Sequence, residues 1–143
     1  MRPTLWVGCE CRSDRDRGPV ARHMITVESE NGDVLCDRCL LADTPWTRLR
    51  GLLGRKRLDE NEGLLIRPAG SVHTFFMRFP IDVVFLTRDD SVVKVVSGLR
   101  PWRLAGARGA RRTLELPSGG AARARVALGQ RLVLVPGRAR EAA

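Results

Sequence analysis

The chain has 143 residues, 43% of them hydrophobic, which suffices for one domain with its own core and argues against two independent domains. No stretch approaches the roughly 20 consecutive apolar residues of a membrane-spanning helix, so we expect no membrane partner. The formal net charge is +9, but every basic residue except Lys56 and Lys94 is Arg. A GC-rich coding sequence produces this bias, so the charge by itself does not specify nucleic-acid binding.

The first 23 residues lack apolar periodicity, and charges alternate over residues 12–17, as is typical of unstructured segments. Patterned sequence begins at Met24. We therefore expect residues 1–23 to be a disordered extension or a mis-assigned start, residues 24–137 to form one β-rich domain, and residues 138–143 to be a disordered tail. The apolar segment 5–8 is too short for an export signal, which predicts a cytoplasmic protein.

The domain is predicted to begin with a β-hairpin. Apolar segments at 25–28 and 34–36 flank Asn31-Gly32, the dipeptide that most readily supplies the positive φ angles of a tight turn. Residues 44–54 then read as a helix, because a capping residue and a first-turn proline precede three leucines that fall on one face. The glycine at the end of this segment is expected to stop the helix.

The rest of the chain is predicted to be strands and one further helix. Six short apolar runs have the length and composition of strands, at residues 63–67, 72–77, 81–86, 92–96, 113–116 and 130–135. Residues 87–91 are expected to join two of them in a second hairpin. Ser118 can cap a helix over 121–128. This order favours an α+β fold of mostly antiparallel β, in a strongly curved sheet or small barrel with two short helices.

Three segments resemble one known family in their order and spacing. They read Arg-Leu-Arg-Gly-Leu-Leu-Gly-Arg at 48–55, Glu-Gly-Leu-Leu at 62–65, and His-Thr-Phe-Phe-Met-Arg-Phe-Pro-Ile-Asp-Val-Val-Phe-Leu at 73–86. The chain thereby resembles domain of unknown function 192, also called uncharacterised protein family 0127, over roughly residues 34–135. The resemblance implies a compact β-rich domain without an established activity, cofactor or catalytic residue. Many members have Phe-Trp-Met-Lys-Asn-Thr where residues 75–80 read Phe-Phe-Met-Arg-Phe-Pro, so polar ligand groups there are not expected in this chain.

The cysteines form two pairs, Cys9-x-Cys11 and Cys36-x-x-Cys39. Four thiolates can complete a zinc site, but both halves of a ribbon-type site usually have two intervening residues. Cys36 and Cys39 alone would need a bend at residues 37–38, because residues three apart on a regular strand point to opposite faces. Inert buried thiols are the leading interpretation, ahead of metal or redox use of Cys36 and Cys39 and of a four-cysteine site.

His73 is the histidine of the patterned domain. It would share one face with Phe75 and Met77 if residues 72–77 form a strand, and His with Met can indicate a soft-metal site. A histidine whose polar atoms are satisfied within an apolar strand is the commoner case. We therefore treat His73 and Met77 as candidate ligand-binding residues and assign no metal to them.

Asp82 lies in an apolar run, where an unpaired carboxylate would be costly. Its expected partner is Arg78, Arg50 or a backbone turn. We expect an apolar cleft at which at least two of His73, Arg78, Asp82 and Arg50 converge. Such a cleft would suit a small ligand with a carboxylate or phosphate, because guanidinium groups bind these anions bidentately.

The segment between Asp90 and Glu115 is the densest cationic stretch, and it contains no acidic residue. Trp102 lies between Arg100 and Arg103, where it can stack or make a cation–π contact. We expect the loop over residues 100–112 to lie close enough to cover the cleft. A solvated loop with arginines set by codon usage is the alternative. The basic residues of the segment are Lys94, Arg100, Arg103, Arg108, Arg111 and Arg112.

No nucleophile–base motif, phosphate-binding glycine loop or dinucleotide-binding motif is legible, so we assign no catalytic residue and no cofactor. The leading hypothesis is a non-enzymatic domain, accessory or binding a small anionic ligand. The alternatives are a small enzyme using His73 and Asp82, and a nucleic-acid-binding protein using residues 94–112. The candidate ligand-binding residues are Arg50, His73, Met77, Arg78, Asp82, Arg100, Trp102 and Arg103.

Overall fold

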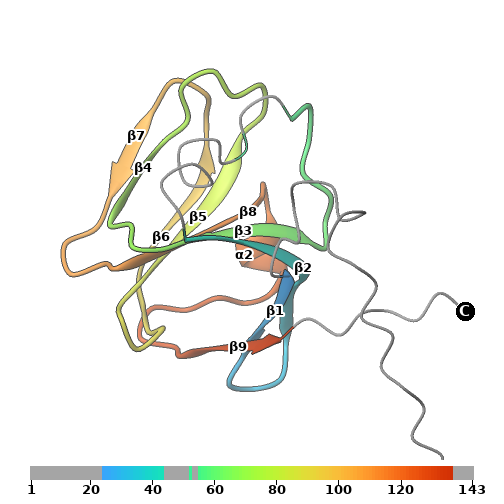
Figure 1. Ribbon diagram of the computed structural model, residues 1–143, viewed down its shortest axis with the longest axis vertical. Helices are drawn as coiled ribbons and strands as arrows, with labels where there is room; N and C mark the ends of the chain where they lie inside the picture. Colours follow the sequence, from blue (N-terminus) through green and yellow to red (C-terminus); the bar gives the residue numbers. More distant parts are fainter. Residues whose placement is uncertain (1–23, 44–51, 53–54, 137–143) are drawn as a thin grey trace, which may run out of the picture.

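The computed structural model describes residues 24–43, 52 and 55–136, and strands dominate them (Figure 1). Seven strands form one sheet and two form a separate ribbon. In chain order the elements are β1 (Met24–Ser29), β2 (Val34–Ala42), β3 (Glu62–Ile66), β4 (Ser71–His73), β5 (Ile81–Leu86), β6 (Val92–Leu99), β7 (Leu104–Gly106), β8 (Arg112–Pro117), α2 (Gly120–Arg123) and β9 (Leu132–Pro136).

Both predicted hairpins are confirmed. β1 and β2 pair antiparallel around Asn31-Gly32, and Gly32 has a φ of 88°, which glycine adopts without steric cost. β5 and β6 pair antiparallel across residues 87–91, where the Thr87 N–H donates to the Ser91 carbonyl oxygen at 2.9 Å. Local turn chemistry therefore specifies these two pairings.

The seven strands run in the order β6-β5-β8-β3-β2-β1-β9, and β2 with β3 is the parallel pair among antiparallel neighbours. The sheet curls until its two edge strands meet at their first residues. Ser91 and Arg131 form a bridge just before β6 and β9, and the Val92 N–H donates to the Gln130 carbonyl oxygen at 2.8 Å. The predicted strongly curved, largely antiparallel sheet is thus confirmed as a half-barrel (Figure 1).

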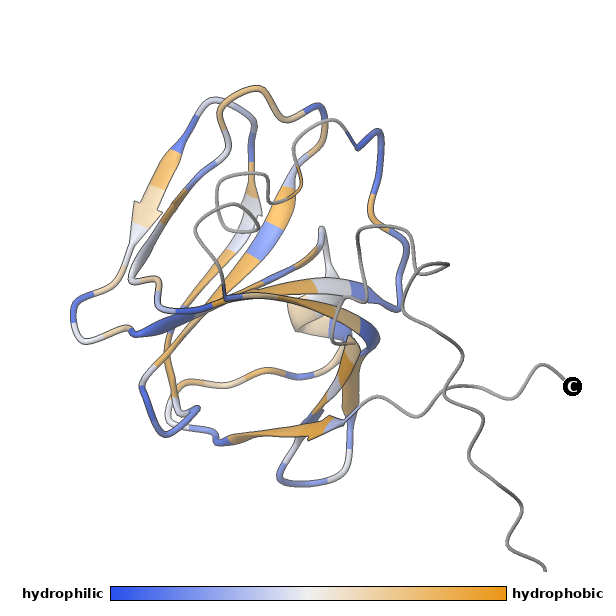
Figure 2. Cartoon of the chain, viewed as in Figure 1, coloured by the Kyte–Doolittle hydropathy of each residue, from blue (hydrophilic) through white to orange (hydrophobic). Residues whose placement is uncertain are grey.

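The curled sheet carries a hydrophobic cluster on each face. Along β5, Val84 and Leu86 belong to the first cluster, which also includes residues of α2 and β9. Ile81, Val83 and Phe85 belong to the second. Because both faces of β5 are buried, the strand has no polar face, and in Figure 2 its orange colour is interrupted by a blue segment.

The second cluster is covered by the β4–β7 ribbon and by the loop over residues 74–80. Val72 of β4 and Ala105 of β7 pair directly and both pack into this cluster. Met77 and Phe79 pack into it from the loop. The ribbon and the loop are therefore fixed over the sheet by apolar contacts on their inner side, and their alternate residues face outward.

The predicted strand over residues 72–77 is wrong beyond His73, where β4 ends. A turn follows, in which the Met77 N–H donates to the Thr74 carbonyl oxygen at 3.2 Å and Phe76 has a φ of 63°. Consequently His73 and Met77 do not share a strand face, and His73 is exposed while Met77 is buried. The structure also adds β7 inside the segment that was predicted to be a plain connection.

The helix predicted over residues 121–128 is shorter than expected, since α2 ends at Arg123. Its N-cap is Gly119 and makes no side-chain capping bond, so Ser118 is not the cap. Arg125 has a φ of 53°, a left-handed conformation that cannot continue a right-handed helix. The helix predicted over 44–54 lies outside the described residues except for Leu52, which is buried in the second cluster. Two helices are therefore not confirmed.

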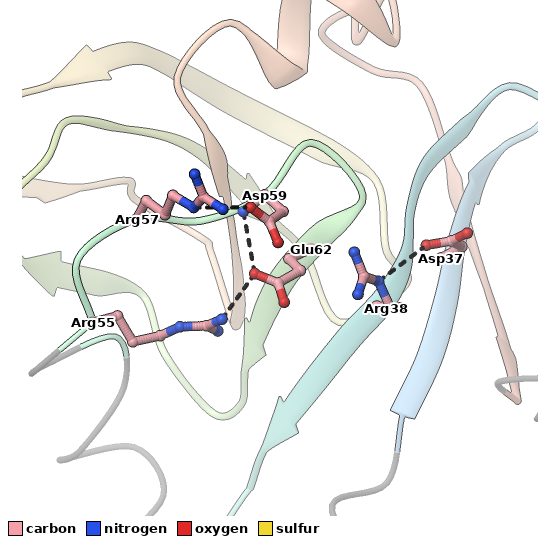
Figure 3. A network of polar contacts seen from close by, with 6 residues as sticks. All are labelled: Asp37, Arg38, Arg55, Arg57, Asp59 and Glu62. Carbon is pink, nitrogen blue, oxygen red and sulfur yellow. Dashed lines mark hydrogen bonds and ion pairs between the residues drawn. The ribbon is translucent and has the colours of Figure 1, made fainter.

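A polar network fixes the chain where it enters β3 (Figure 3). The Glu62 carboxylate accepts hydrogen bonds from the Arg55 guanidinium at 2.8 Å and from the Asp59 N–H at 3.1 Å. Arg57 forms an exposed ion pair with Asp59 at 3.3 Å. Glu62 thus holds the loop over residues 55–61 in place, and this structural role explains the glutamate of the Glu-Gly-Leu-Leu motif.

Candidate functional site

Four aromatic rings form a continuous row over the end of the β4–β7 ribbon. The His73 ring stacks on Phe75 with centroids 5.1 Å apart, Phe75 lies 5.9 Å from Trp102, and Trp102 lies 4.6 Å from Phe76. We call these four residues the aromatic cluster. Leu104 extends it, because it pairs with His73 across the ribbon and points to the same outer face.

The aromatic cluster presents large apolar groups to solvent. Phe76 is 71% exposed, Trp102 is 55% exposed and Leu104 is 71% exposed. Single exposed apolar residues are common on protein surfaces, but contiguous ones commonly mark binding surfaces. The cluster therefore fits a binding role better than a purely structural one.

Thr74 joins the two loops that carry the rings. Its buried hydroxyl donates to the Arg100 carbonyl oxygen at 2.6 Å and accepts from the Arg103 N–H at 2.9 Å. Its own N–H donates to the Arg103 carbonyl oxygen at 2.9 Å, and its carbonyl oxygen accepts from the Trp102 N–H at 3.0 Å. One threonine thus fixes loop 74–80 against loop 100–103.

Two residues of the aromatic cluster have strained backbones. Phe76 has a φ of 63° and Trp102 a φ of 62°. Bulky residues rarely adopt this left-handed conformation, which costs on the order of 1–3 kcal/mol and persists only where the surroundings enforce it. The hydrogen bonds of Thr74 enforce it here, and strain of this kind is concentrated at functional sites.

Arginines occur on the loops that carry the aromatic cluster. Arg78, Arg100 and Arg103 are exposed, and they lie on the same two loops as the rings. The Arg103 guanidinium donates to the Trp102 carbonyl oxygen at 3.3 Å, so this cation lies against the backbone of the residue that carries the indole. Neither residues 63–81 nor residues 91–114 contain an acidic side chain. The local charge is therefore positive and suits an anion.

Asp82 lies apart from this surface. Its fully buried carboxylate accepts a hydrogen bond from the Gly98 N–H at 2.8 Å and another from the Ala121 N–H at 3.1 Å. Of the expected partners, the backbone is the one observed, and no hydrogen bond joins Asp82 to His73 within the described part of the chain. The Asp82 carboxylate is thus buried and bound to the backbone, whereas His73 is exposed and stacks on Phe75.

The other candidates divide between the surface and the interior. Met77 packs into the second hydrophobic cluster beneath the loop, so it can support the rings without being exposed itself. Arg50 lies outside the described residues. Arg112 forms an ion pair with Asp90 at 2.6 Å, and the Lys94 ammonium donates to the Gly106 carbonyl oxygen at 2.9 Å. Arg112 is therefore neutralised by an acid, and Lys94 is held at the β4–β7 ribbon.

Cys36 and Cys39 lie on the same face of β2. Between them the register with β1 slips, because Ile25 pairs with Cys39 and Val27 with Cys36, so residues 37–38 form a bulge. This is the bend that joint use of the two thiols requires. Both thiols are buried in the first hydrophobic cluster. The pKa of the Cys39 thiol is raised well above its usual value, mainly by a hydrogen bond with Cys36 and secondly by burial.

The raised pKa of the Cys39 thiol disfavours the thiolate, which is the form that binds a metal ion. Gly63 packs so closely that a Cβ there would lie 2.9 Å from the Cys36 sulfur. Over residues 24–43, 52 and 55–136, no group of three or more His, Cys, Asp or Glu side chains is arranged to hold a metal ion.

The same residues contain no helix that is long and apolar enough to cross a bilayer.

Glu115 is the notable residue that sequence reasoning missed. It is 4% exposed, it lies between Leu64 and Val83 across the sheet, and burial raises the pKa of its carboxyl to about 8. None of the described residues donates a hydrogen bond to this carboxyl. An acid in the alternating run Thr-Leu-Glu-Leu reads as the solvent side of a strand. A signal for its burial was available in the sequence of β5, which has no polar face. A strand buried on both faces predicts that the strand paired with it, here β8, is buried on both faces as well.

Comparison with known proteins identifies relatives of the chain. The model of the DUF192 family, described as "Uncharacterized ACR", matches residues 26–134. A "UPF0127 protein" from Thermococcus sibiricus is 33% identical over 98 residues, which are 65% of this chain. The matched part is 63% of the length of that relative.

Two solved structures have a similar fold. A protein of unknown function from Novosphingobium aromaticivorans superposes with a TM-score of 0.68 at 25% identity, covering 81% of this chain and 89% of that one. A putative transcription regulator from Sinorhizobium meliloti superposes with a TM-score of 0.69 at 23% identity, covering 82% and 98%.

Proposed function

We propose, on the premise that the chain belongs to the DUF192 family of unknown function, that it is a non-enzymatic domain that binds a small ligand carrying an anionic group. The ligand lies on the aromatic cluster, with its anion on Arg78, Arg100 and Arg103. The proposal also places the protein in the cytoplasm, where thiols such as the free Cys36 and Cys39 stay reduced.

One observation carries this proposal. Two large aromatic side chains, Phe76 and Trp102, are held in solvent by strained backbones, and a buried threonine fixes both loops around them. Exposing these rings and straining their backbones both cost free energy, and a bound ligand that covers the rings offsets the first cost. The adjacent arginines supply bidentate donors for a carboxylate or phosphate.

The test begins with native mass spectrometry of the full chain purified from its own host, to detect a co-purifying small molecule. A thermal-shift titration with phosphate, phenyl phosphate, benzoate and hexanoate follows. A ligand present at 100 times its Kd stabilises the folded state by about 2.7 kcal/mol, so we expect at least one of these anions to raise the melting temperature by several degrees.

The matched variants are Arg103→Gln in the site and Arg88→Gln in the exposed β5–β6 turn. We expect Arg103→Gln to lose most of the anion-induced shift and Arg88→Gln to retain it. Equal shifts in the two variants would place anion binding elsewhere. An unliganded mass together with no shift from any of the four anions would refute the proposed function.

A further inference from the structure

The geometry of the aromatic cluster limits the apolar part of its ligand to one flat group. The exposed rings of Phe76 and Trp102 are tilted by 59° to each other. A planar ligand ring can therefore lie parallel to one of them and meet the other only at an angle. This arrangement accepts a single planar group, whereas a stack of successive bases needs a series of roughly parallel faces.

Trp102 is the ring best placed for such stacking. It contacts both Phe75 and Phe76, which restricts its orientation, and it is still 55% exposed. Aliphatic ligands do not require a pre-oriented indole, because hydrophobic contact is not directional. A rigid, exposed indole favours a planar aromatic ligand.

The charges beside Trp102 define the second part of the ligand. The Arg103 guanidinium donates a hydrogen bond to the Trp102 carbonyl oxygen, and Arg100 lies two residues before Trp102 in the sequence. Arg78 lies on the facing loop, two residues after Phe76. These loops carry no carboxylate that would receive a cationic group. Up to three guanidinium groups for one small ligand suit the dianionic charge of a phosphate monoester better than the single charge of a carboxylate.

We propose that the ligand is a nucleoside phosphate, with its base on the indole of Trp102 and its phosphate on the arginines. This inference rests on the proposed function and narrows it to one ligand chemistry. A free nucleotide and the terminal nucleotide of a nucleic-acid strand both present this chemistry.

The experiment measures binding of AMP, ribose 5-phosphate and adenosine to the full chain. Substituting the other two tryptophans, Trp6→Phe and Trp46→Phe, leaves Trp102 as the sole indole, whose fluorescence a stacked base should quench. We expect AMP to quench this fluorescence. We also expect AMP to bind about tenfold or more tightly than ribose 5-phosphate, because base stacking on an aromatic side chain contributes roughly that factor. Adenosine should likewise bind more weakly, since it lacks the phosphate.

The site variant is Trp102→Asn, because asparagine tolerates a left-handed backbone better than other residues and should preserve the loop. The control is Leu128→Asn, which removes an exposed apolar side chain outside the aromatic cluster. Trp102→Asn should lose at least tenfold in AMP affinity while its weak affinity for ribose 5-phosphate is unchanged. Leu128→Asn should bind AMP normally.

Two results would overturn this inference. If ribose 5-phosphate binds as tightly as AMP, the anion site of the proposed function stands and base recognition is wrong. If AMP does not bind while phenyl phosphate or benzoate does, the ligand is an aromatic anion other than a nucleotide. If AMP binds as expected, a 5′-phosphorylated hexanucleotide distinguishes the two sources of the ligand. An affinity far above that of AMP indicates the end of a nucleic-acid strand, and an affinity equal to or below that of AMP indicates the free nucleotide.

Discussion

Glu115 shows how one residue can make stability depend on pH. Its carboxyl lies on the β8 face that meets Leu64 and Val83, and burial raises its pKa from 4.5 to about 8. The folded protein therefore keeps a proton at neutral pH that the unfolded chain releases. Between these two pKa values the unfolded state binds fewer protons, so rising pH favours unfolding.

We expect Glu115 to reduce the free energy of unfolding by up to about 1.4 kcal/mol per pH unit from pH 5 to pH 8. Glu115→Gln keeps the shape and cannot ionise, so it should become more stable relative to the unchanged chain as the pH rises. Urea unfolding at four pH values measures this difference. The exposed Glu60 provides the control variant, Glu60→Gln, which should follow the unchanged chain. A difference between Glu115→Gln and the unchanged chain that does not vary with pH would contradict the prediction.

At the scale of elements, Asp82 connects three parts of the fold. It belongs to β5, and its carboxylate accepts hydrogen bonds from Gly98 in β6 and from Ala121 in α2. A β5–β6 register shift lies beside it, between Ile81 and Val83. The carboxylate thus satisfies a backbone N–H where regular strand pairing is interrupted, and it anchors a helix too short to be stable by itself.

We expect Asp82→Ala to lower the free energy of unfolding by about 3 kcal/mol, because it removes both acceptors and leaves two N–H groups without a partner. Asp82→Asn should have an intermediate effect, since its amide keeps one acceptor oxygen and turns a donor toward the other N–H. Asp89→Ala in the exposed turn should change stability by less than about 0.5 kcal/mol. Chemical denaturation measures all three. If Asp82→Ala is no worse than Asp89→Ala, Asp82 does not hold these elements together.

At the scale of the whole molecule, we expect a chain that starts at Met24 to unfold at the same temperature as the full chain. Residues 1–23 have no apolar periodicity with which to pack, and the first strand of the described residues is β1, from Met24. Differential scanning calorimetry of both chains makes the comparison. A midpoint several degrees lower in the shorter chain would show that the first 23 residues contribute to the folded domain.

The sequence by itself determined the features that depend on neighbouring residues. Asn31-Gly32 predicted the first hairpin, and the short apolar runs predicted five of the strands to within a few residues. The requirement that a buried carboxylate has partners was correct for Asp82. These inferences hold because turn geometry, side-chain alternation and the cost of burying charge act within a few residues of the chain.

Only the tertiary structure decided which side chains meet. Three of the four rings of the aromatic cluster come from residues 73–76, and the hydrogen bonds of Thr74 bring the fourth, Trp102, to them from a distant segment. The bulge at residues 37–38 turned Cys36 and Cys39 to one face, and a neighbouring strand without a polar face buried Glu115. These outcomes depend on hydrogen bonds and packing between distant segments, and periodicity within one segment carries no information about its neighbours.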